Sequence, residues 1–557
     1  MSLQAVQSYA VPEDTARTAR TARTIFPQGS PVMRMRDELH MIMEDRDFSD
    51  LFPARGQPAE APVRLALTTL LQFMEGLTDR QAAHAVRTRI DWKYLLCLEL
   101  DDAGFDHTVL SEFRSRLCVH GAERRLFDAV LALAQARGVL KAGGRQRSDS
   151  THVLGKVRTL GRYALVAQTL RHALDALAQA APEWLRAHIT PVWVDRYRAR
   201  SCELRLPKGA AHCKEWIAQT GADGMAPLGA LMDAHAPGPL RWIPQVETLR
   251  QVWVQNFMIE WVADEPRVVW RAANNIALAG DYIASPHDTE VRRACKGQTE
   301  WIGFKVHLTE TCDTATPNLI THVETTAATV TDNTVTPVIH AALQQRALLP
   351  GIHIADTAYV NSTLLVESRE HYRVELVGPT RQDNLWQAKA ADGFAASNFK
   401  MDFASQCAVC LASKTSQNWK PTLDPYGKPI IKIRWSRNDC GPCDRHERCT
   451  HSVPPQRQLT VLPQAQHEAL HERRAHEQTA DFAAEYARRS GIEGTISEAV
   501  RAHQVRRTRY IGQAKTHLAH LMTAAAINVA RLLRWLAGEP KACLHRTHLE
   551  QLFKALA

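Results

Sequence analysis

Two acidic residues lie where a folded chain of this sequence could hold divalent metal ions. Asp149 lies in the expected strand 148–154, and Asp356 ends the apolar stretch 352–355. Polar residues at the carboxyl ends of strands in open α/β sheets face the ligand crevice. Two carboxylates at short range repel unless a cation lies between them, and Mg²⁺ takes oxygen ligands while keeping waters that a phosphate can replace. The pair therefore predicts a magnesium site, whereas either aspartate by itself would indicate only an exposed side chain.

The third acidic candidate is Glu493, which stands between Gly491 and Gly494. Helical spacing places Tyr486 and Arg489 on the same face as Glu493. Each glycine costs a helix interior about 1 kcal/mol relative to alanine, so the two glycines make better sense where a backbone or a DNA strand approaches closely. The alternative is that Gly491 ends one helix and Glu493 caps the next, and it would be preferred without the two upstream aspartates.

A cluster of cysteines lies between the second aspartate and the glutamate. Cys440 and Cys443 form a Cys-x-x-Cys pair, Cys449 follows, and Cys407 and Cys410 lie upstream. Four thiolates bind structural zinc tetrahedrally, which would stabilise a small polar insertion that has little core of its own. We predict a zinc site of Cys410, Cys440, Cys443 and Cys449, with Cys407 as a substitute. Unligated thiols are the alternative.

The composition is that of a soluble globular protein with a polyanionic partner. The chain has 557 residues, a mass of 62.4 kDa, a formal net charge of +9 and a pI near 9.0. This length predicts several domains, and the excess of Lys and Arg favours a polyanion. The segment from Met1 to Pro27 lacks the apolar core of a secretory signal, and no run of about eighteen apolar residues occurs. We therefore expect a cytosolic protein without a membrane partner, whose twelve cysteines form no disulfide framework.

The N-terminal part of the chain has the pattern of short helices. One of them begins at a capping box of Thr78 and Gln81. Another, over 108–117, leaves Arg114 and Arg116 free to face outward. Short helices that end in an Arg-bearing one are typical of a helix-turn-helix that lies in a DNA groove. A small helical bundle with a solvated basic face is the alternative.

Alternating and apolar stretches around the two aspartates predict a mixed α/β layer architecture. Residues 301–308 alternate, with Ile302, Phe304, Val306 and Leu308 on one face, which is typical of a half-buried strand. An amphipathic stripe in the C-terminal helix over 512–536 indicates core. The elements expected after the strand 148–154 are a helical stretch to about residue 279, the strand 301–308, its partner 319–325, a helix over 334–348, the strand 353–356, a helix over 364–370 and the strand 374–377.

These residues lie in segments that resemble the DDE transposases of bacterial insertion sequences. Asp149 in SDSTHV, Asp356 in IADTAYV and Glu493 in YARRSGIEGTISEAVR resemble their catalytic triad, which an RNase H-like core carries. The likeness covers nearly the whole chain and looks strongest to the eleven-eighty-two family. It rests on GLTDRQAAHAVRTRIDWKYLL, FDHTVLSEFRSRL, SPHDTEVR, WIGFKVHLTETCD and TRYIGQAKTHLAHLMTAAAINVARLLRWL as well.

A related transposase signature runs Tyr, two residues, Arg, three residues, Glu, six residues, Lys. Tyr486, Arg489 and Glu493 meet it, whereas its last place is Val500. The resemblance implies that Tyr486 and Arg489 position DNA phosphates, for which the planar fork of arginine donors is suited. A basic run after Glu493 would extend this contact as a phosphate track, or else form a solvated face. The run consists of Arg501, which could replace the missing lysine, with Arg506, Arg507, Arg509 and Lys515.

By this resemblance the protein cuts DNA at the ends of an insertion sequence and joins those ends to a target. Two Mg²⁺ or Mn²⁺ ions would be held by Asp149 and Asp356, with Glu493 completing the second site, and would stabilise in-line attack on a phosphate. The implied partners are double-stranded DNA of the ends and the target, and a second copy in a homodimer, at the nucleoid in the bacterial cytoplasm. The alternatives are an RNase H-fold nuclease without strand transfer and an inactive DNA-binding relic. The intact triad argues against the relic.

The expected fold is an α/β RNase H-like core with an N-terminal all-α, helix-turn-helix-like domain, a helical insert and a β-rich, cysteine-bearing insertion. A Thr-Ala-Arg repeat over 15–23 is too short to build a core and indicates a flexible start. The expected boundaries are 1–34 for a flexible basic arm, 35–140 for the helical DNA-binding domain, 145–380 for the first part of the core with its helical insert at about 158–280, 381–470 for the insertion with the zinc site, and 471–557 for the last part of the core with the Glu493 helix and the C-terminal helices.

Overall fold

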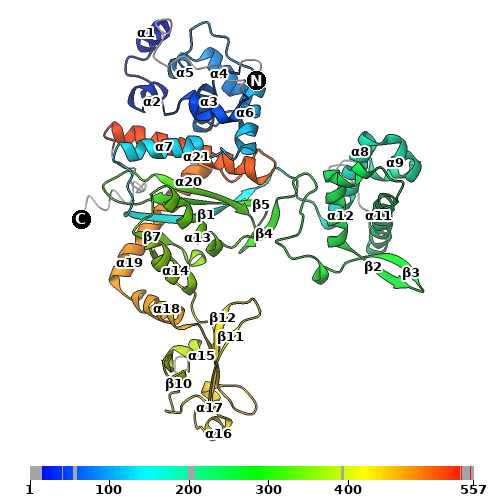
Figure 1. Ribbon diagram of the computed structural model, residues 1–557, viewed down its shortest axis with the longest axis vertical. Coiled ribbons are helices and arrows are strands. Elements are labelled where there is room, and N and C mark those ends of the chain that lie inside the picture. Colours follow the sequence, from blue (N-terminus) through cyan, green and yellow to red (C-terminus); the bar gives the residue numbers. More distant parts are fainter. Residues whose placement is uncertain are drawn as a thin grey trace.

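The computed structural model in Figure 1 describes residues 16–539 apart from 40–41, 54, 56–58, 199–206 and 391–393, together with 541 and 552. Its centre is a six-stranded mixed sheet in the order β4-β5-β1-β7-β8, with β6 paired to β5. Strand β1 is antiparallel to β5 and parallel to β7, so the predicted mixed α/β architecture is confirmed. The elements of this core are β1 (Arg145–Leu154), β4 (Arg292–Lys296), β5 (Thr299–Thr311), β6 (Ile320–Ala327), α13 (Thr336–Gln345), β7 (Ile352–Ala355), η6 (Thr357–Tyr359), α14 (Ser362–Tyr372), β8 (Glu375–Val377), α20 (Ser490–Arg501) and α21 (Gln513–Leu536).

Helices cover both faces of this sheet. Helices α20 and α21 lie on one face, and α13 and α14, which connect parallel strands, lie on the other. Strand β5 alternates as predicted, but the prediction that it is half-buried is wrong. Phe304 and His307 point to opposite faces and are both fully buried. Crossovers between parallel strands put helices on the second face of a sheet, and the alternation within one strand does not reveal them.

The N-terminal helices form a head, most of which lies above α21 in Figure 1, whereas α7 lies beside that helix. The predicted capping box is confirmed, because Thr78 Oγ1 accepts a hydrogen bond from the backbone N–H of Gln81, whose side chain in turn accepts one from the N–H of Thr78. Helix α3 packs on α21 and joins the head to the core. The helices of the head are α1 (Ala16–Ile25), α2 (Pro31–Leu39), η2 (Asp45–Leu51), α3 (Pro62–Glu75), α4 (Asp79–Thr88), α5 (Ile90–Leu96), α6 (Thr108–Val119) and α7 (Arg125–Ala136).

The prediction of a flexible arm over 1–34 is wrong from Ala16 onward, and residues 1–15 of it lie outside the described residues. The Thr-Ala-Arg repeat forms most of α1, with Thr18 and Ala22 fully buried. Thr18 Oγ1 donates a hydrogen bond of 2.9 Å to the carbonyl oxygen of Leu98. Residues four positions apart share one face of a helix, so even a short repeat of three residues supplies two small side chains that pack against the head.

The segment between β1 and β4 forms a lobe to one side of the sheet, with an apolar core of its own that includes Trp253 and Phe257. The prediction of an entirely helical insert is wrong, since a hairpin of β2 and β3 follows the last helix. Its turn residues Ala263 and Asp264 have φ angles of 50° and 66°, the left-handed pair that a two-residue type I′ turn needs. The usual Asn-Gly signal of such a turn is missing from the sequence. The lobe contains α8 (Arg162–Ala180), α9 (Pro182–His188), α10 (Pro191–Tyr197), α11 (Ala210–Ala230), α12 (Pro244–Asn256), β2 (Phe257–Val262) and β3 (Glu265–Trp270).

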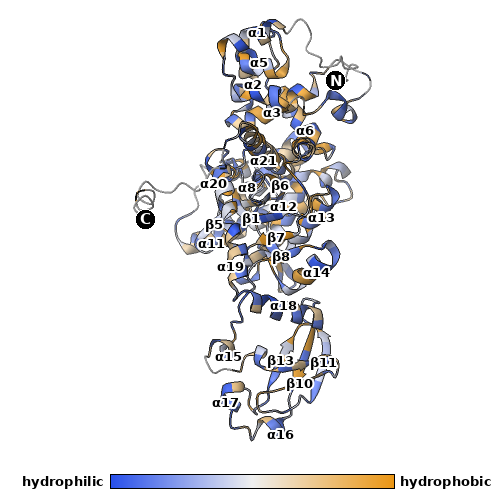
Figure 2. Ribbon diagram, turned by 90° about the vertical axis from the view of Figure 1, so that its left-hand side faces the viewer, coloured by the Kyte–Doolittle hydropathy of each residue, from blue (hydrophilic) through white to orange (hydrophobic). Residues whose placement is uncertain are grey.

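A lobe that we call the cysteine lobe, residues 394–461, lies at the other end of the molecule from the head, as Figures 1 and 2 show. Its small core is built around Ile433 and Trp435, which are almost completely buried. Within the described part of the chain, no helix is long and apolar enough to cross a membrane. The lobe and its return to the sheet contain β9 (Lys400–Asp402), β10 (Cys407–Val409), β11 (Asn418–Leu423), β12 (Pro429–Arg434), α16 (Arg437–Cys440), α17 (His446–Cys449), β13 (Gln458–Val461), α18 (Gln464–His476), α19 (Ala480–Tyr486) and η8 (Ala487–Arg489).

Candidate active site

Asp149 and Asp356 lie on neighbouring strands of the central sheet. The parallel register pairs Ser148 of β1 with Ala355 of β7, so the two aspartates are the next residues along both strands. The side chain of Asp149 is 12% exposed. Asp356 accepts a 2.7 Å hydrogen bond from the backbone N–H of Ala358 and thereby begins the turn η6. The two carboxylates are thus held where a cation could serve both.

Arg489 joins the third candidate, Glu493, to this pair. Its Nη2 lies 2.7 Å from Oδ2 of Asp149, and its Nη1 lies 2.9 Å from Oε1 of Glu493. The Arg489 side chain is 17% exposed, whereas that of Glu493 is 63% exposed. Both ends of the Arg489 guanidinium are therefore paired with carboxylates in this structure, and its contact with DNA phosphates stays a prediction.

Burial raises the pKa of the Asp149 carboxyl, and the nearby Asp356 raises it as well, while Arg489 and the N–H of Ser150 oppose the rise. Burial also raises the pKa of Tyr486, which lies near all three acidic groups. Among the described residues, no three His, Cys, Asp or Glu side chains stand in an arrangement that could hold a metal ion. The chemistry of the donor set nevertheless suits one, because the carboxylates need a cation and the Arg489 guanidinium supplies that charge here.

The two glycines beside Glu493 lie in different surroundings. Both belong to α20, so the alternative in which Gly491 ends a helix is wrong. A Cβ atom on Gly491 would lie 2.0 Å from Nη1 of Arg147, whereas one on Gly494 would meet no atom within 4 Å. The predicted close approach therefore holds for Gly491 alone, and the group that approaches it is an arginine of β1 rather than a backbone.

We expect Gly494→Ala to stabilise the protein and Gly491→Ala to destabilise it. Alanine favours a helix interior by about 1 kcal/mol over glycine, and at position 494 nothing opposes that gain. At position 491 the methyl group displaces the buried Arg147 guanidinium, and such overpacking costs about 1–3 kcal/mol. Urea denaturation of the two variants measures the difference. An equal stabilisation by both would contradict the position of Arg147 against α20.

The predicted DNA-contacting residues divide into an exposed group and a buried one. Arg506 Nε donates to Thr151 Oγ1 of β1, and Arg509 Nη1 donates to the carbonyl oxygen of Leu77 in the head, each at 2.9 Å. The stretch that begins at the end of α20 thus connects the strand of Asp149 to the head and exposes positively charged side chains to solvent. Its exposed members are Arg501, Arg506, Arg507, Arg509 and Lys515.

The prediction that Arg114 faces outward is wrong. Its side chain is 5% exposed, and its Nη2 lies 2.6 Å from Oδ2 of Asp79 at the start of α4. Arg116 is partly buried, with its guanidinium over the ring of Phe52. Helical spacing shows which residues share a face, but the packing of α4 against α6 decided that the face of Arg114 turns inward.

The four cysteines chosen as zinc ligands line a single pocket of the cysteine lobe, and Cys407 is not among the lining residues. Burial raises the pKa of the Cys449 thiol to about 11, and the thiols of Cys440, Cys410 and Cys443 raise it as well. The backbone N–H of Arg457 lies 3.4 Å from Sγ of Cys440 and points to it. The thiols therefore stand close enough to influence one another electrostatically.

Sequence reasoning missed two residues beside the acidic site of Asp149, Asp356 and Glu493. Arg147 precedes Asp149 by two positions on β1, and Glu310 of β5 is fully buried and pairs with it. A charged residue near the end of each strand is a weak signal, since such positions are commonly exposed. The pairing follows from the antiparallel register, in which Arg147 lies directly opposite Glu310.

Two protein families match parts of this chain. A family described as Transposase DDE domain matches residues 409–533, which extend from the cysteine lobe through Glu493 to α21. A family described as Transposase domain (DUF772) matches residues 20–116 in the head. Asp149 and Asp356 lie outside both matched ranges. No curated protein matches the chain.

Proposed function

We propose that Asp149, Asp356 and Glu493 hold the divalent metal ions with which this chain, a DDE transposase of an insertion sequence, cuts DNA. The observation that carries the proposal is the juxtaposition of Asp149 and Asp356 on adjacent strands, with Glu493 joined to Asp149 through Arg489. A DDE domain implies an RNase H-like core, and the mixed sheet with helices on both faces agrees with that. Membership of the eleven-eighty-two family stays a prediction.

The residues of this site have distinct parts in the proposed chemistry. Bound Mg²⁺ or Mn²⁺ would stabilise the attacking and leaving oxygens of an in-line phosphoryl transfer. Asp149 and Asp356 supply ligands from a rigid sheet, and the exposed Glu493 supplies the third from the side that DNA can reach. Arg489 neutralises Asp149 and Glu493 and keeps both side chains turned toward the site. Tyr486, which is partly exposed beside them, contacts the DNA phosphate.

DNA lies along the exposed basic stretch that leads from β1 to the head. The proposed contacts are electrostatic and independent of base sequence, so the affinity should fall with salt as counterions return to the phosphates. We assign the recognition of the element ends to the head over 35–140 and the chemistry to the core over 145–380 and 471–557. A homodimer in the bacterial cytoplasm would bring the two ends together.

Strand transfer is tested with a labelled duplex that carries the end of the element, a supercoiled target plasmid and Mg²⁺. We expect label to become joined to the plasmid, because the freed 3′-hydroxyl attacks a target phosphate. A precut end with a 3′-dideoxy terminus is the control and should bind without joining. Cutting without joining would favour a nuclease, and DNA binding without either reaction would favour an inactive relic.

We also propose that Cys410, Cys440, Cys443 and Cys449 bind a structural zinc ion in the cysteine lobe, although their side chains, like the other described ones, do not stand in a ligand arrangement in this structure. The shared pocket and the mutual effect of the thiols on their pKa values support this assignment, because thiolates that lie this close repel one another unless a cation is present. The N–H of Arg457 is available to a Cys440 thiolate as a hydrogen-bond donor. Because the lobe has only a small apolar core, a bound zinc ion would contribute to its folding stability.

A further inference from the structure

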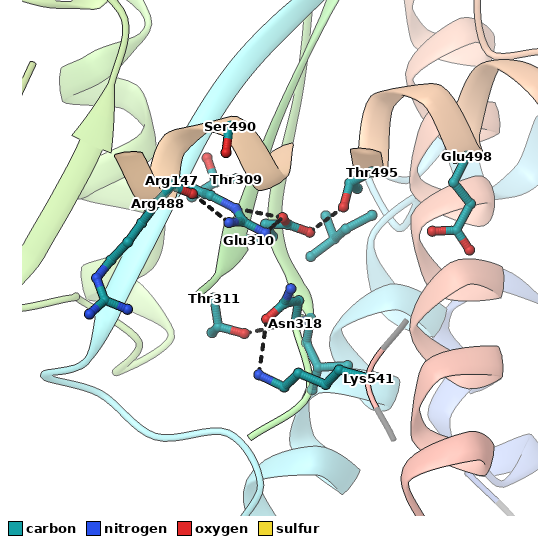
Figure 3. A network of polar contacts seen from close by, with 12 residues as sticks. Arg147, Thr309, Glu310, Thr311, Asn318, Arg488, Ser490, Thr495, Glu498 and Lys541 are labelled. Carbon is teal, nitrogen blue, oxygen red and sulfur yellow. Dashed lines mark hydrogen bonds and ion pairs between the residues drawn. The ribbon is translucent and has the colours of Figure 1, made fainter. Parts of the chain in front are cut away.

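A buried network of charges connects the strand of Asp149 to the helix of Glu493 (Figure 3). Its centre is Glu310 of β5, which is fully buried. Arg147 of β1 approaches Oε1 of Glu310 with Nε at 2.8 Å and Nη2 at 2.6 Å. Thr495 of α20 donates to Oε2 at 2.6 Å, and Nη1 of Arg531 in α21 donates to the same oxygen at 2.9 Å. Two strands and two helices therefore meet at one carboxylate.

Two members of this network each stand two residues from a proposed metal ligand. Arg147 precedes Asp149 on the same face of β1, and Thr495 follows Glu493 on α20. Arg147 Nη1 also donates a 2.5 Å hydrogen bond to the carbonyl oxygen of Arg488, the residue before Arg489. Glu310 thus bonds to the strand that carries Asp149 through Arg147, and to the helix that carries Glu493 through Thr495.

This arrangement leaves little freedom in the distance between β1 and α20. Gly491 has no side chain, and the Arg147 guanidinium fills the space beside it. A buried carboxylate is costly unless it is paired and fully hydrogen-bonded, and both oxygens of Glu310 have two donors. Fully satisfied buried networks make their surroundings rigid. A shift of α20 away from the sheet would break the bond to Thr495 and leave Oε2 of the buried Glu310 with one donor fewer.

We propose that Glu310 is a positioning residue that sets the separation of Asp149 and Glu493 and thereby the affinity of the site for divalent metal. The inference rests on the proposed function, since it takes these two residues as metal ligands. Metal sites need ligands held close to their productive geometry, and loss of a group that orients a metal ligand typically costs about 10–100-fold in affinity. Glu310 touches neither metal nor DNA and acts through Arg147 and Thr495.

The test measures Mn²⁺ binding to the full-length protein by electron paramagnetic resonance, in which free Mn²⁺ gives the signal. We expect Glu310→Gln and Thr495→Val to raise the dissociation constant about 10-fold or more. Thr495→Ser keeps the hydroxyl and should restore wild-type affinity. Glu498→Gln is the matched comparison on α20 and should change the affinity far less, because the 40% exposed Glu498 reaches the network only through Nη2 of Arg531 and leaves the bonds of Arg147 and Thr495 to Glu310 in place. Thermal melts establish that each variant is folded.

The outcomes separate this inference from the proposed function. If Asp149→Ala binds Mn²⁺ as the wild type does, the proposed ligand set is wrong and the inference falls with it. If Asp149→Ala loses the ion but a folded Glu310→Gln keeps wild-type affinity, the inference alone is overturned. Should Glu310→Gln fail to fold, Thr495→Val against Thr495→Ser decides the question, because equal affinities in that pair would overturn the inference as well.

Discussion

Replacement of Asp149 by asparagine is expected to lower metal-dependent cleavage of element ends by more than about 100-fold, because even a residue that only orients a metal ligand contributes 10–100-fold. The substitution keeps the shape of the side chain and removes its charge, so it weakens both the metal site and the pairing with Arg489. Asp356→Asn should have an effect of similar size. Cleavage is measured on a labelled end duplex with Mg²⁺ or Mn²⁺, and DNA binding by gel shift.

DNA binding should survive in these variants, because the exposed basic stretch and the head are not altered. The matched pair on α20 is Glu493→Gln and Glu498→Gln, which make the same change in two carboxylates of one helix. We expect the first to lose cleavage and the second to keep it. Normal cutting by Glu493→Gln would remove that residue from the ligand set, and an active triple substitution of Asp149, Asp356 and Glu493 would disprove the mechanism.

Removal of zinc is expected to unfold the cysteine lobe while the central sheet keeps its structure. Zinc contributes on the order of 10–16 kcal/mol of apparent binding free energy in small zinc domains, whereas the lobe has only a small core around Ile433 and Trp435. Elemental analysis should find zinc in the purified protein. A chelator should then make the region of residues 394–461 sensitive to protease before the remainder of the chain.

Single substitutions identify the ligands of that zinc. Cys440→Ser and Cys443→Ser should lose the metal, because each removes one of four thiolates. Cys407→Ser is the control, since Cys407 lies in β10 and does not line the pocket. A metal-free wild-type protein, or a loss of zinc in Cys407→Ser equal to that in Cys440→Ser, would refute the assignment.

The sequence by itself determined the features that depend on neighbouring residues. The capping box of Thr78 and Gln81 needs only the local chain, and it was predicted correctly. The end of β7 just before Asp356 and the alternation of β5 follow in the same way from short patterns of apolar residues. Local periodicity tells which side chains turn toward a core, so it also placed Asp149 in a strand and Asp356 at the end of another.

Only the tertiary structure decided what those elements meet. Arg114 turned inward because α4 packs on α6, and the second face of β5 was buried by helices that come later in the chain. The register that puts Asp149 beside Asp356 and the bond between Arg147 and Glu310 join residues more than 150 positions apart. Such pairings have no periodic trace in the sequence, because they are selected by packing and by the cost of an unpaired buried charge, which exist only once the chain has folded.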